Sequence, residues 1–179
     1  MRQPGDAIIE SLVQATLDFI RDHQAWVAPI VLVLAFGESL AFISLLLPAT
    51  AILFATGGLM AAAGIDFWPV WAAAALGAFL GDWLSYWLGY HFRERISTIW
   101  PLSRQPHLLA RGHAFFQKWG LAGIFMGRFF GPLRAAVPLV AGICTMPQHH
   151  FQLANAASAL VWAAGILAPG VLGASFFFN

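Results

Sequence analysis

Charged residues and cysteines are scarce in this sequence. Only 9% of the 179 residues are Asp, Glu, Lys or Arg, and 60% are hydrophobic, whereas about a quarter of a soluble domain is charged. The net charge of +1 provides no strongly basic surface, so we expect no nucleic-acid partner. Cys144 is the only cysteine, which excludes an internal disulfide and a metal site built from several cysteines. The low charge and the apolar composition predict an all-α integral membrane protein.

Motifs for common catalytic and metal sites are also missing. The six histidines show no H-E-x-x-H spacing, and the chain contains neither a G-x-S-x-G turn nor a P-loop. We therefore expect a protein that is not an enzyme and that needs neither a metal ion nor another cofactor.

The first 25 residues carry charges that alternate with apolar side chains. Ile8, Leu12 and Ile20 fall on or near one helical stripe, and acidic and basic residues occupy most of the other positions. Because the charges are spread throughout, this segment does not have the form of a cleavable signal peptide. The pattern predicts an amphipathic helix at the membrane interface over residues 1–25, with a soluble helix packed on a partner as the alternative.

Three apolar zones follow, and only parts of them match single spanning helices. Residues 68–90 and 151–178 reach the length of about 20 residues that a spanning helix needs. Residues 26–63 and 119–145 are each too long for one spanning helix and short for two. We predict that each forms a re-entrant helical hairpin, whose broken backbone is surrounded by protein. The residues predicted to break these hairpins are Pro48, Thr50, Gly131, Pro132 and Pro138.

The two halves of the membrane domain, residues 26–179, resemble each other. Pro48 and Pro132 are 84 positions apart, and the same offset superposes Thr50 on Arg134. It also relates Gly58 to Gly142, Phe67 to Phe151, Leu76 to Leu160 and Gly81 to Gly165. We predict a first repeat over about residues 26–90, a polar connection over 91–118 and a second repeat over about 119–179. Each repeat is a hairpin followed by a spanning helix, and one spanning helix between the hairpins gives the repeats inverted topology.

Four ionisable residues lie inside the apolar zones. A charge at the bilayer centre costs about 2.5–3.5 kcal/mol, so Glu38, Asp82, Arg128 and Arg134 are predicted to face an internal cavity. Guanidinium groups match phosphate oxygens bidentately, and we predict that the two arginines bind phosphate while the two acids act as counter-charges or proton-coupling groups. The residues leave two alternatives open, namely a purely structural ion pair and arginines that contact headgroups non-specifically at the interface.

The segments that carry these residues resemble the DedA family of bacterial inner-membrane proteins, whose domain is called the SNARE-associated or VTT domain in eukaryotic relatives. The matching segments are GESLAFISLLLPATAILFATGGL, GAFLGDWLSYWLGYHF, KWG and GRFFGPLRAAVPLVAGICTMPQHHF. The resemblance implies opposed re-entrant hairpins and movement of undecaprenyl phosphate or phospholipid across the bilayer, with proton-motive force involved. By motif, Glu38 corresponds to the membrane glutamate of the family, and Arg128 and Arg134 to its arginine pair. Thr50 stands where many members have an acidic residue, so the carboxylate pair implied for proton coupling is incomplete.

The sequence thus predicts a multi-pass inner-membrane transporter that moves a phosphate-bearing lipid between leaflets as a flippase or scramblase. Its expected partners are membrane lipids and, if transport is coupled, protons. One alternative is a proton-coupled exchanger of small ions or drugs, and another is a non-transporting scaffold that supports envelope integrity. The sequence leaves open the lipid, the direction and energy source of transport, the side of the N-terminus and homo-oligomer formation. The cation-rich connection over 91–118 is expected in the cytoplasm.

Overall fold

The chain is described by a computed structural model that covers residues 11, 14–15, 18, 22–40, 49–93, 107–130 and 133–178. The regular elements in these ranges are helices, which confirms the predicted all-α class. The helices are α2 (Gln24–Ser39), α3 (Ala49–Ala63), α4 (Phe67–His91), α6 (His107–Gly127), α7 (Leu133–Ile143) and α8 (Gln148–Phe178). Most of the predicted interfacial helix over residues 1–25 lies outside the described residues.

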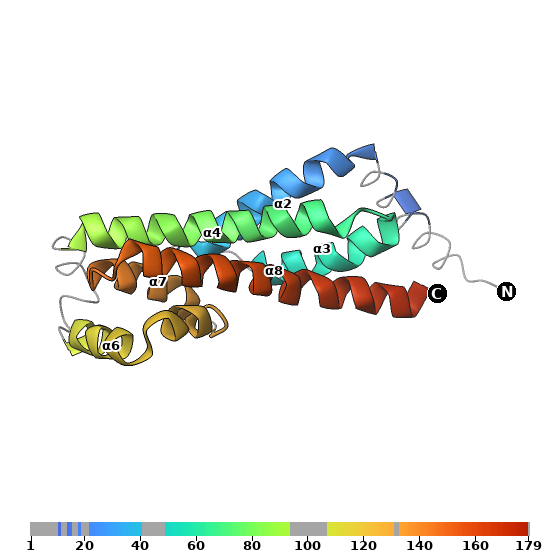
Figure 1. Cartoon of the computed structure of the whole chain (residues 1–179). Helices are drawn as coiled ribbons and strands as arrows, with labels where there is room; N and C mark the ends of the chain where they lie inside the picture. Colours follow the sequence, from blue (N-terminus) through green and yellow to red (C-terminus); the bar gives the residue numbers. More distant parts are fainter. Residues whose placement is uncertain are drawn as a thin grey trace.

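Two long helices, α4 and α8, form the centre of the molecule and run in opposite directions (Figure 1). Phe67–His91 and Gln148–Gly173 are the helical segments in the described ranges that are long and apolar enough to cross a membrane. They coincide with the two spanning segments that the sequence predicts. The proline at position 169 lies inside α8, and the helix continues through it because neighbouring helices in a bundle can compensate for a missing hydrogen bond.

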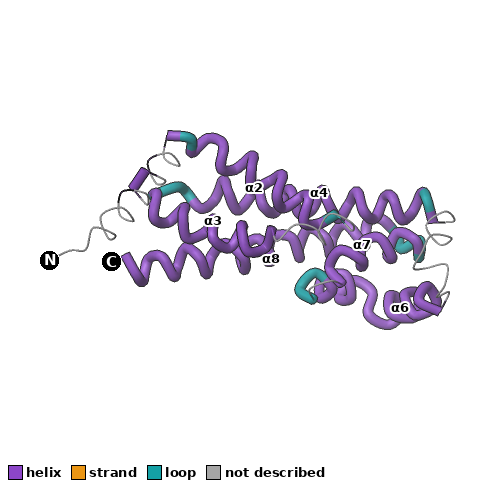
Figure 2. The backbone as a smooth tube through the Cα atoms, turned by 180° about the vertical axis from the view of Figure 1, so that it is seen from behind, coloured by secondary structure: helices purple, strands orange, loops and turns teal. Residues whose placement is uncertain are grey.

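The shorter helices pack against these two in pairs. Helices α2 and α7 lie on α4, whereas α3 and α6 lie on α8. Figures 1 and 2 show α2 and α3 beside one half of the long helices and α6 and α7 beside the other half. Because each short helix covers only half of a long one, the ends of several short helices come to lie near the middle of the molecule.

Small residues on α4 allow this close packing. A Cβ atom at Gly77 would overlap the carbonyl oxygen of Leu32 in α2, and one at Gly89 would overlap the carbonyl oxygen of Leu139 in α7. The four-residue spacing of small side chains along α4 therefore forms the ridge on which two neighbouring helices approach.

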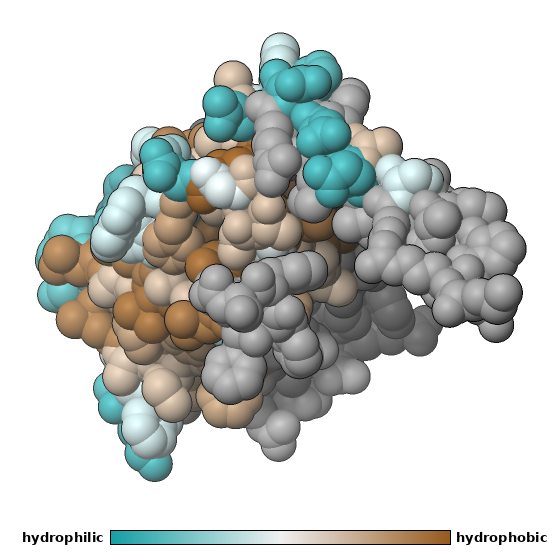
Figure 3. Space-filling view, turned by 90° about the vertical axis from the view of Figure 1, so that its right-hand side faces the viewer, coloured by the Kyte–Doolittle hydropathy of each residue, from teal (hydrophilic) through white to brown (hydrophobic). Residues whose placement is uncertain are grey.

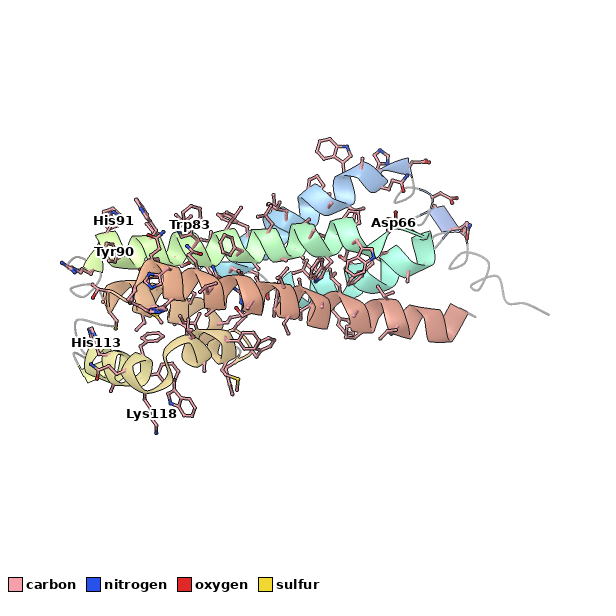
Figure 4. All side chains as sticks on the ribbon, in the orientation of Figure 1. Asp66, Trp83, Tyr90, His91, His113 and Lys118 are labelled. Carbon is pink, nitrogen blue, oxygen red and sulfur yellow. The ribbon has the colours of Figure 1, made fainter. Side chains whose placement is uncertain are left out.

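Large apolar side chains remain on the outside of the bundle. Trp26, Val33, Leu153 and Leu172 are each more than 60% exposed, and Figure 3 shows apolar residues gathered on one face with hydrophilic residues towards its edges. Figure 4 places Asp66 at one end of the long helices and His91 at the other. An apolar middle between polar ends is the distribution expected of a bundle surrounded by lipid.

Pro138 does not break a hairpin as predicted, because it lies inside α7 and is fully buried. Packing of α7 on α4 outweighs the local cost of the proline. Thr50, also predicted as a breaker, lies in the first turn of α3. Pro48, Gly131 and Pro132 lie outside the described residues.

Helix α6 begins at His107, so part of the predicted polar connection over 91–118 is helical. The helix changes direction at Gly120, which has φ of 47°.

The turn after α7 contains a strained residue. Thr145 has φ of 54°, and the N–H groups of Thr145 and Met146 donate to the carbonyls of Gly142 and Ala141 at 2.9 and 3.1 Å. This is the position after a helix at which glycine is favoured, and a side chain there costs about 1–2 kcal/mol.

We therefore expect Thr145→Gly to raise the free energy of unfolding by about 1 kcal/mol. Thermal unfolding in detergent micelles, followed by circular dichroism, should show a higher Tm. Thr56→Gly in α3 is the control and should lower Tm slightly, because glycine is a poorer helix former. A Tm for Thr145→Gly at or below that of the wild type would contradict this interpretation of the turn.

Candidate functional site

The four predicted charged residues come from four parts of the fold. Glu38 lies in the last turn of α2, Asp82 in the middle of α4, Arg128 directly after α6 and Arg134 in the first turn of α7. Three of them are placed by the ends of short helices, and these ends lie near the middle of α4 and α8 (Figure 1). The fold therefore brings together side chains that are up to 96 residues apart in sequence.

Glu38 and Arg134 form the first ion pair. Arg134 Nη1 lies 2.6 Å from Glu38 Oε1, and the hydroxyl of Thr50 donates to the same oxygen. Arg134 Nη2 donates to Ser39 Oγ at 3.4 Å. The guanidinium carbon lies 4.5 Å from the centre of the Trp162 ring, in a cation–π contact. These contacts hold the carboxylate and the guanidinium between α2, α3, α7 and α8.

Asp82 and Arg128 form the second ion pair through Arg128 Nη2. The same nitrogen donates to Asn155 Oδ1 at 2.6 Å, and Asn155 Nδ2 donates to the carbonyl oxygen of Phe79 at 3.0 Å. Ser158 Oγ donates to the carbonyl of Asn155 at 3.1 Å. Asn155 thus links Arg128 to the backbone of α4.

A serine contact connects the two ion pairs. The hydroxyl of Ser85, one turn after Asp82, donates to the carbonyl oxygen of Ser39 at 3.4 Å. Ser39 also accepts from Arg134, so both pairs belong to one polar cluster (Glu38, Ser39, Thr50, Asp82, Ser85, Arg128, Arg134, Asn155 and Ser158). The cluster joins residues from both predicted repeats.

The charged groups are almost fully removed from the surface. Glu38 is 3%, Asp82 6% and Arg128 4% exposed. Burying an ion pair costs several kcal/mol per ion before the attraction between the ions is counted. Hydrophobic residues of similar volume in the same place often stabilise a fold equally well. Glu38 Oε2 and Arg128 Nε and Nη1 also have no hydrogen-bond partner among the described residues. An arginine with spare buried N–H groups has the capacity to bind a further anion.

The four charged residues lie apart from three cavities that described residues bound. Cavities of about 310, 210 and 310 Å³ lie between α4 and α8, beside the turn at Met146 and between α6 and α7. None of these three cavities is lined by Glu38, Asp82, Arg128 or Arg134. The acids and the guanidinium groups contact one another directly.

Sequence reasoning missed Asn155, Ser158 and Trp162. Asn155 and Ser158 are fully buried and lie three positions apart in the apolar part of α8. Polar side chains at this spacing share one helix face, which was the signal available in the sequence. The sequence did not show which acid pairs with which arginine. In the structure Asp82 pairs with Arg128 and Glu38 pairs with Arg134.

Among the described residues, no three His, Cys, Asp or Glu side chains are grouped to hold a metal ion.

Comparison with known proteins places this chain in a family. The VTT domain model matches residues 47–172. Inner membrane protein YabI of Escherichia coli is 34% identical over 161 residues, which cover 89% of this chain and 63% of YabI. An uncharacterized membrane protein of Buchnera aphidicola is 32% identical over 80% of this chain and 57% of the relative. Inner membrane protein YghB of Escherichia coli is 32% identical over 69% of this chain and 57% of its own length.

The chain thus spans about three fifths of the length of the relatives it matches. No solved structure matches it. The names of the Escherichia coli relatives support a location in the inner membrane. With a match of the domain model over most of the chain, and with relatives that are membrane proteins, this chain belongs to the DedA family of VTT-domain membrane proteins.

Proposed function

We propose that this protein is a multi-pass transporter that moves a phosphate-bearing lipid between the leaflets of the inner membrane, as a flippase or scramblase. The observation that carries the proposal is the polar cluster, in which two buried arginine–carboxylate pairs lie beside the middle of two helices of membrane-spanning length. Helix α4 has 25 residues, about 37 Å at 1.5 Å per residue, against a hydrocarbon layer of about 30 Å. Ionisable groups at such a depth mark transport pathways.

An inverted repeat of two re-entrant hairpins would explain how the halves meet. A Cβ atom at Gly142 would meet the carbonyl oxygen of Tyr86, and one at Gly58 would meet the carbonyl oxygen of Gly170. Both glycines and both partners are related by the offset of 84 residues that the sequence shows. Thr50 and Arg134, a further pair at this offset, both bind Glu38. These matched contacts support a two-fold relation between the repeats.

The geometry allows a lipid phosphate to replace a carboxylate. Arg128 already has unpartnered N–H groups at Nε and Nη1, which supply donors for phosphate oxygens. Once phosphate binds, the negative charge of Asp82 or Glu38 is no longer needed to balance the arginines. In a site of low dielectric, the displaced carboxylate then favours taking up a proton, which is where coupling to a proton gradient would enter. The lipid itself is not chemically changed, and no cofactor takes part.

Because the ion pairs are closed in this conformation, transport requires that the halves separate. Helices α2 and α7 are bound across the cluster by Glu38 and Arg134, so breaking this pair would open a path between α2–α3 and α6–α7. Binding of phosphate to both arginines supplies the free energy that separates these helix pairs, because a ligand shifts a protein towards the conformation that it binds better.

Reconstitution in vesicles tests the proposal. A quencher added outside the vesicles reaches only fluorescent phospholipid in the outer leaflet. Phospholipid from the inner leaflet should become accessible to the quencher faster in vesicles with the protein than in vesicles without it. A fluorescent diacylglycerol, which has no phosphate, serves as the control for leakage and should move equally fast in both. No acceleration of the phospholipid would contradict lipid transport. Proton uptake driven by a pH gradient in vesicles without added lipid phosphate would instead favour the exchanger of small ions.

A further inference from the structure

An apolar cavity of about 310 Å³ lies between the two long helices. Its lining consists of apolar and aromatic side chains from α4 and α8, among them Trp71, Ala75, Phe79, Ala156, Ala159 and Leu160. Leu160 is 43% exposed, so the cavity opens towards the outside of the bundle. Since both helices are of membrane-spanning length, we expect this opening to face the hydrocarbon layer, where hydrocarbon chains are abundant.

Two hydrogen bonds between α4 and α8 bound this cavity along the helix axes. At one end Trp71 Nε1 donates to the carbonyl oxygen of Leu160 at 3.1 Å. At the other end Asn155 Nδ2 donates to the carbonyl oxygen of Phe79 at 3.0 Å. Asn155 does not itself line the cavity but is bonded to Phe79, which does, and we call this side of the cavity its polar end.

The polar end is the side of the cavity nearest to the polar cluster. Asn155 holds Phe79 with its Nδ2 and accepts from Arg128 with its Oδ1 at 2.6 Å. Arg128 is 4% exposed and has no partner for Nε or Nη1 among the described residues. One amide side chain thus links a residue of the apolar lining to a buried cation with spare donors. Apolar surface next to unpartnered N–H groups is complementary to a molecule with a hydrocarbon chain and an anionic headgroup.

We propose that the α4–α8 cavity holds the hydrocarbon chain of a phosphate-bearing lipid, and that Asn155 separates this chain from Arg128. When the headgroup enters, the single bond to Phe79 is released and Asn155 Nδ2 donates to a phosphate oxygen, while Oδ1 keeps its bond to Arg128. Asn155 is thus a positioning residue for Arg128 at rest and a headgroup ligand during transport. This inference rests on the proposed function, because it names the part of the lipid that each side of the site receives.

Photo-crosslinking in vesicles tests the cavity directly. The full chain is reconstituted with phosphatidylglycerol that carries a diazirine in the middle of one acyl chain, and labelled residues are mapped by mass spectrometry. We expect labelling concentrated on residues 71–79 and 156–160. Ala156→Phe fills the cavity and should lower this labelling at least fivefold. Ala157→Phe is the matched control, since Ala157 is the exposed neighbour outside the lining, and should leave labelling unchanged.

Ala72→Phe fills the cavity from α4 and provides a second variant if Ala156→Phe does not fold. Equal labelling in filled and control variants, or labelling spread evenly over the outer faces of α2 and α6, would overturn the inference. Arg128-dependent phospholipid movement without labelling of the cavity overturns the inference alone and leaves the proposed function standing. Labelling that is concentrated on the cavity in the wild type and lost in the filled variants supports a hydrocarbon-chain site in the α4–α8 cavity. The vesicle assay with wild-type protein then decides separately whether the bound lipid is transported.

Discussion

Replacing Arg134 by alanine is expected to slow lipid-phosphate movement in vesicles by about 10- to 100-fold. Arg134 binds Glu38 at 2.6 Å and lies over Trp162, so it is fixed where a phosphate would exchange with the carboxylate. Hydrogen bonds to charged groups contribute about 1.5–3 kcal/mol, and each 1.4 kcal/mol corresponds to a factor of ten. The quencher assay on reconstituted protein measures the rate.

Arg134→Lys separates charge from geometry. Lysine keeps the positive charge but lacks the planar pair of donors, so the variant should lie between wild type and Arg134→Ala. Arg93→Ala is the matched control, because Arg93 is exposed, lies two positions after α4 and is outside the polar cluster. The rate of this variant should stay within about twofold of the wild type, a change below 0.5 kcal/mol. Equal rates for wild type and Arg134→Ala would refute the role of this arginine in transport.

A large loss of stability is expected when only one partner of the Asp82–Arg128 pair is replaced. Asp82→Asn leaves a buried guanidinium without its counter-charge, which costs about 3–5 kcal/mol. Asp82→Asn combined with Arg128→Met removes the charge as well as its partner, and should cost clearly less than the sum of the two single variants. Equilibrium unfolding in mixed micelles with increasing sodium dodecyl sulfate, followed by circular dichroism, measures the free energies.

The double variant also separates structural from transport roles. If the pair is needed for lipid movement, the double variant should be folded but should not accelerate lipid-phosphate movement. Additive free energies in the double-mutant cycle would mean that Asp82 and Arg128 do not stabilise each other. A double variant that transports at the wild-type rate would assign the pair a purely structural role.

The sequence predicts the long helices and the charged residues because both signals are local. Residues 68–90 and 151–178 are apolar over a length that only a spanning helix needs, and α4 and α8 correspond to them. Glu38 and Arg134 are conspicuous because each is a charge in an apolar segment. Their proximity could be expected from the repeat, since Thr50 and Arg134 occupy equivalent positions.

Other features depend on tertiary packing that a sequence pattern does not contain. Pro138 has the strongest helix-breaking tendency of any residue type, but α7 continues through it because the helix is packed on α4. Asn155 shares a helix face with Ser158, but its bonds to Arg128 and to the carbonyl oxygen of Phe79 depend on how the helices pack. The choice of partners in the two ion pairs was also not predictable, because a charge pattern does not show which acid meets which arginine.

The measurement that tests the central claim most directly is the distance between the arginine side chains and lipid phosphate in the membrane. Solid-state nuclear magnetic resonance on vesicles detects dipolar coupling between ¹⁵N-labelled guanidinium groups and ³¹P. A hydrogen bond of about 2.7–2.9 Å from nitrogen to a phosphate oxygen gives a strong coupling. The account predicts a component of this coupling that is present in the wild type and lost in Arg128→Lys/Arg134→Lys, with the coupling of interfacial arginines unchanged. The same coupling in wild type and double variant would show that no phosphate reaches the buried arginines, and would contradict the account.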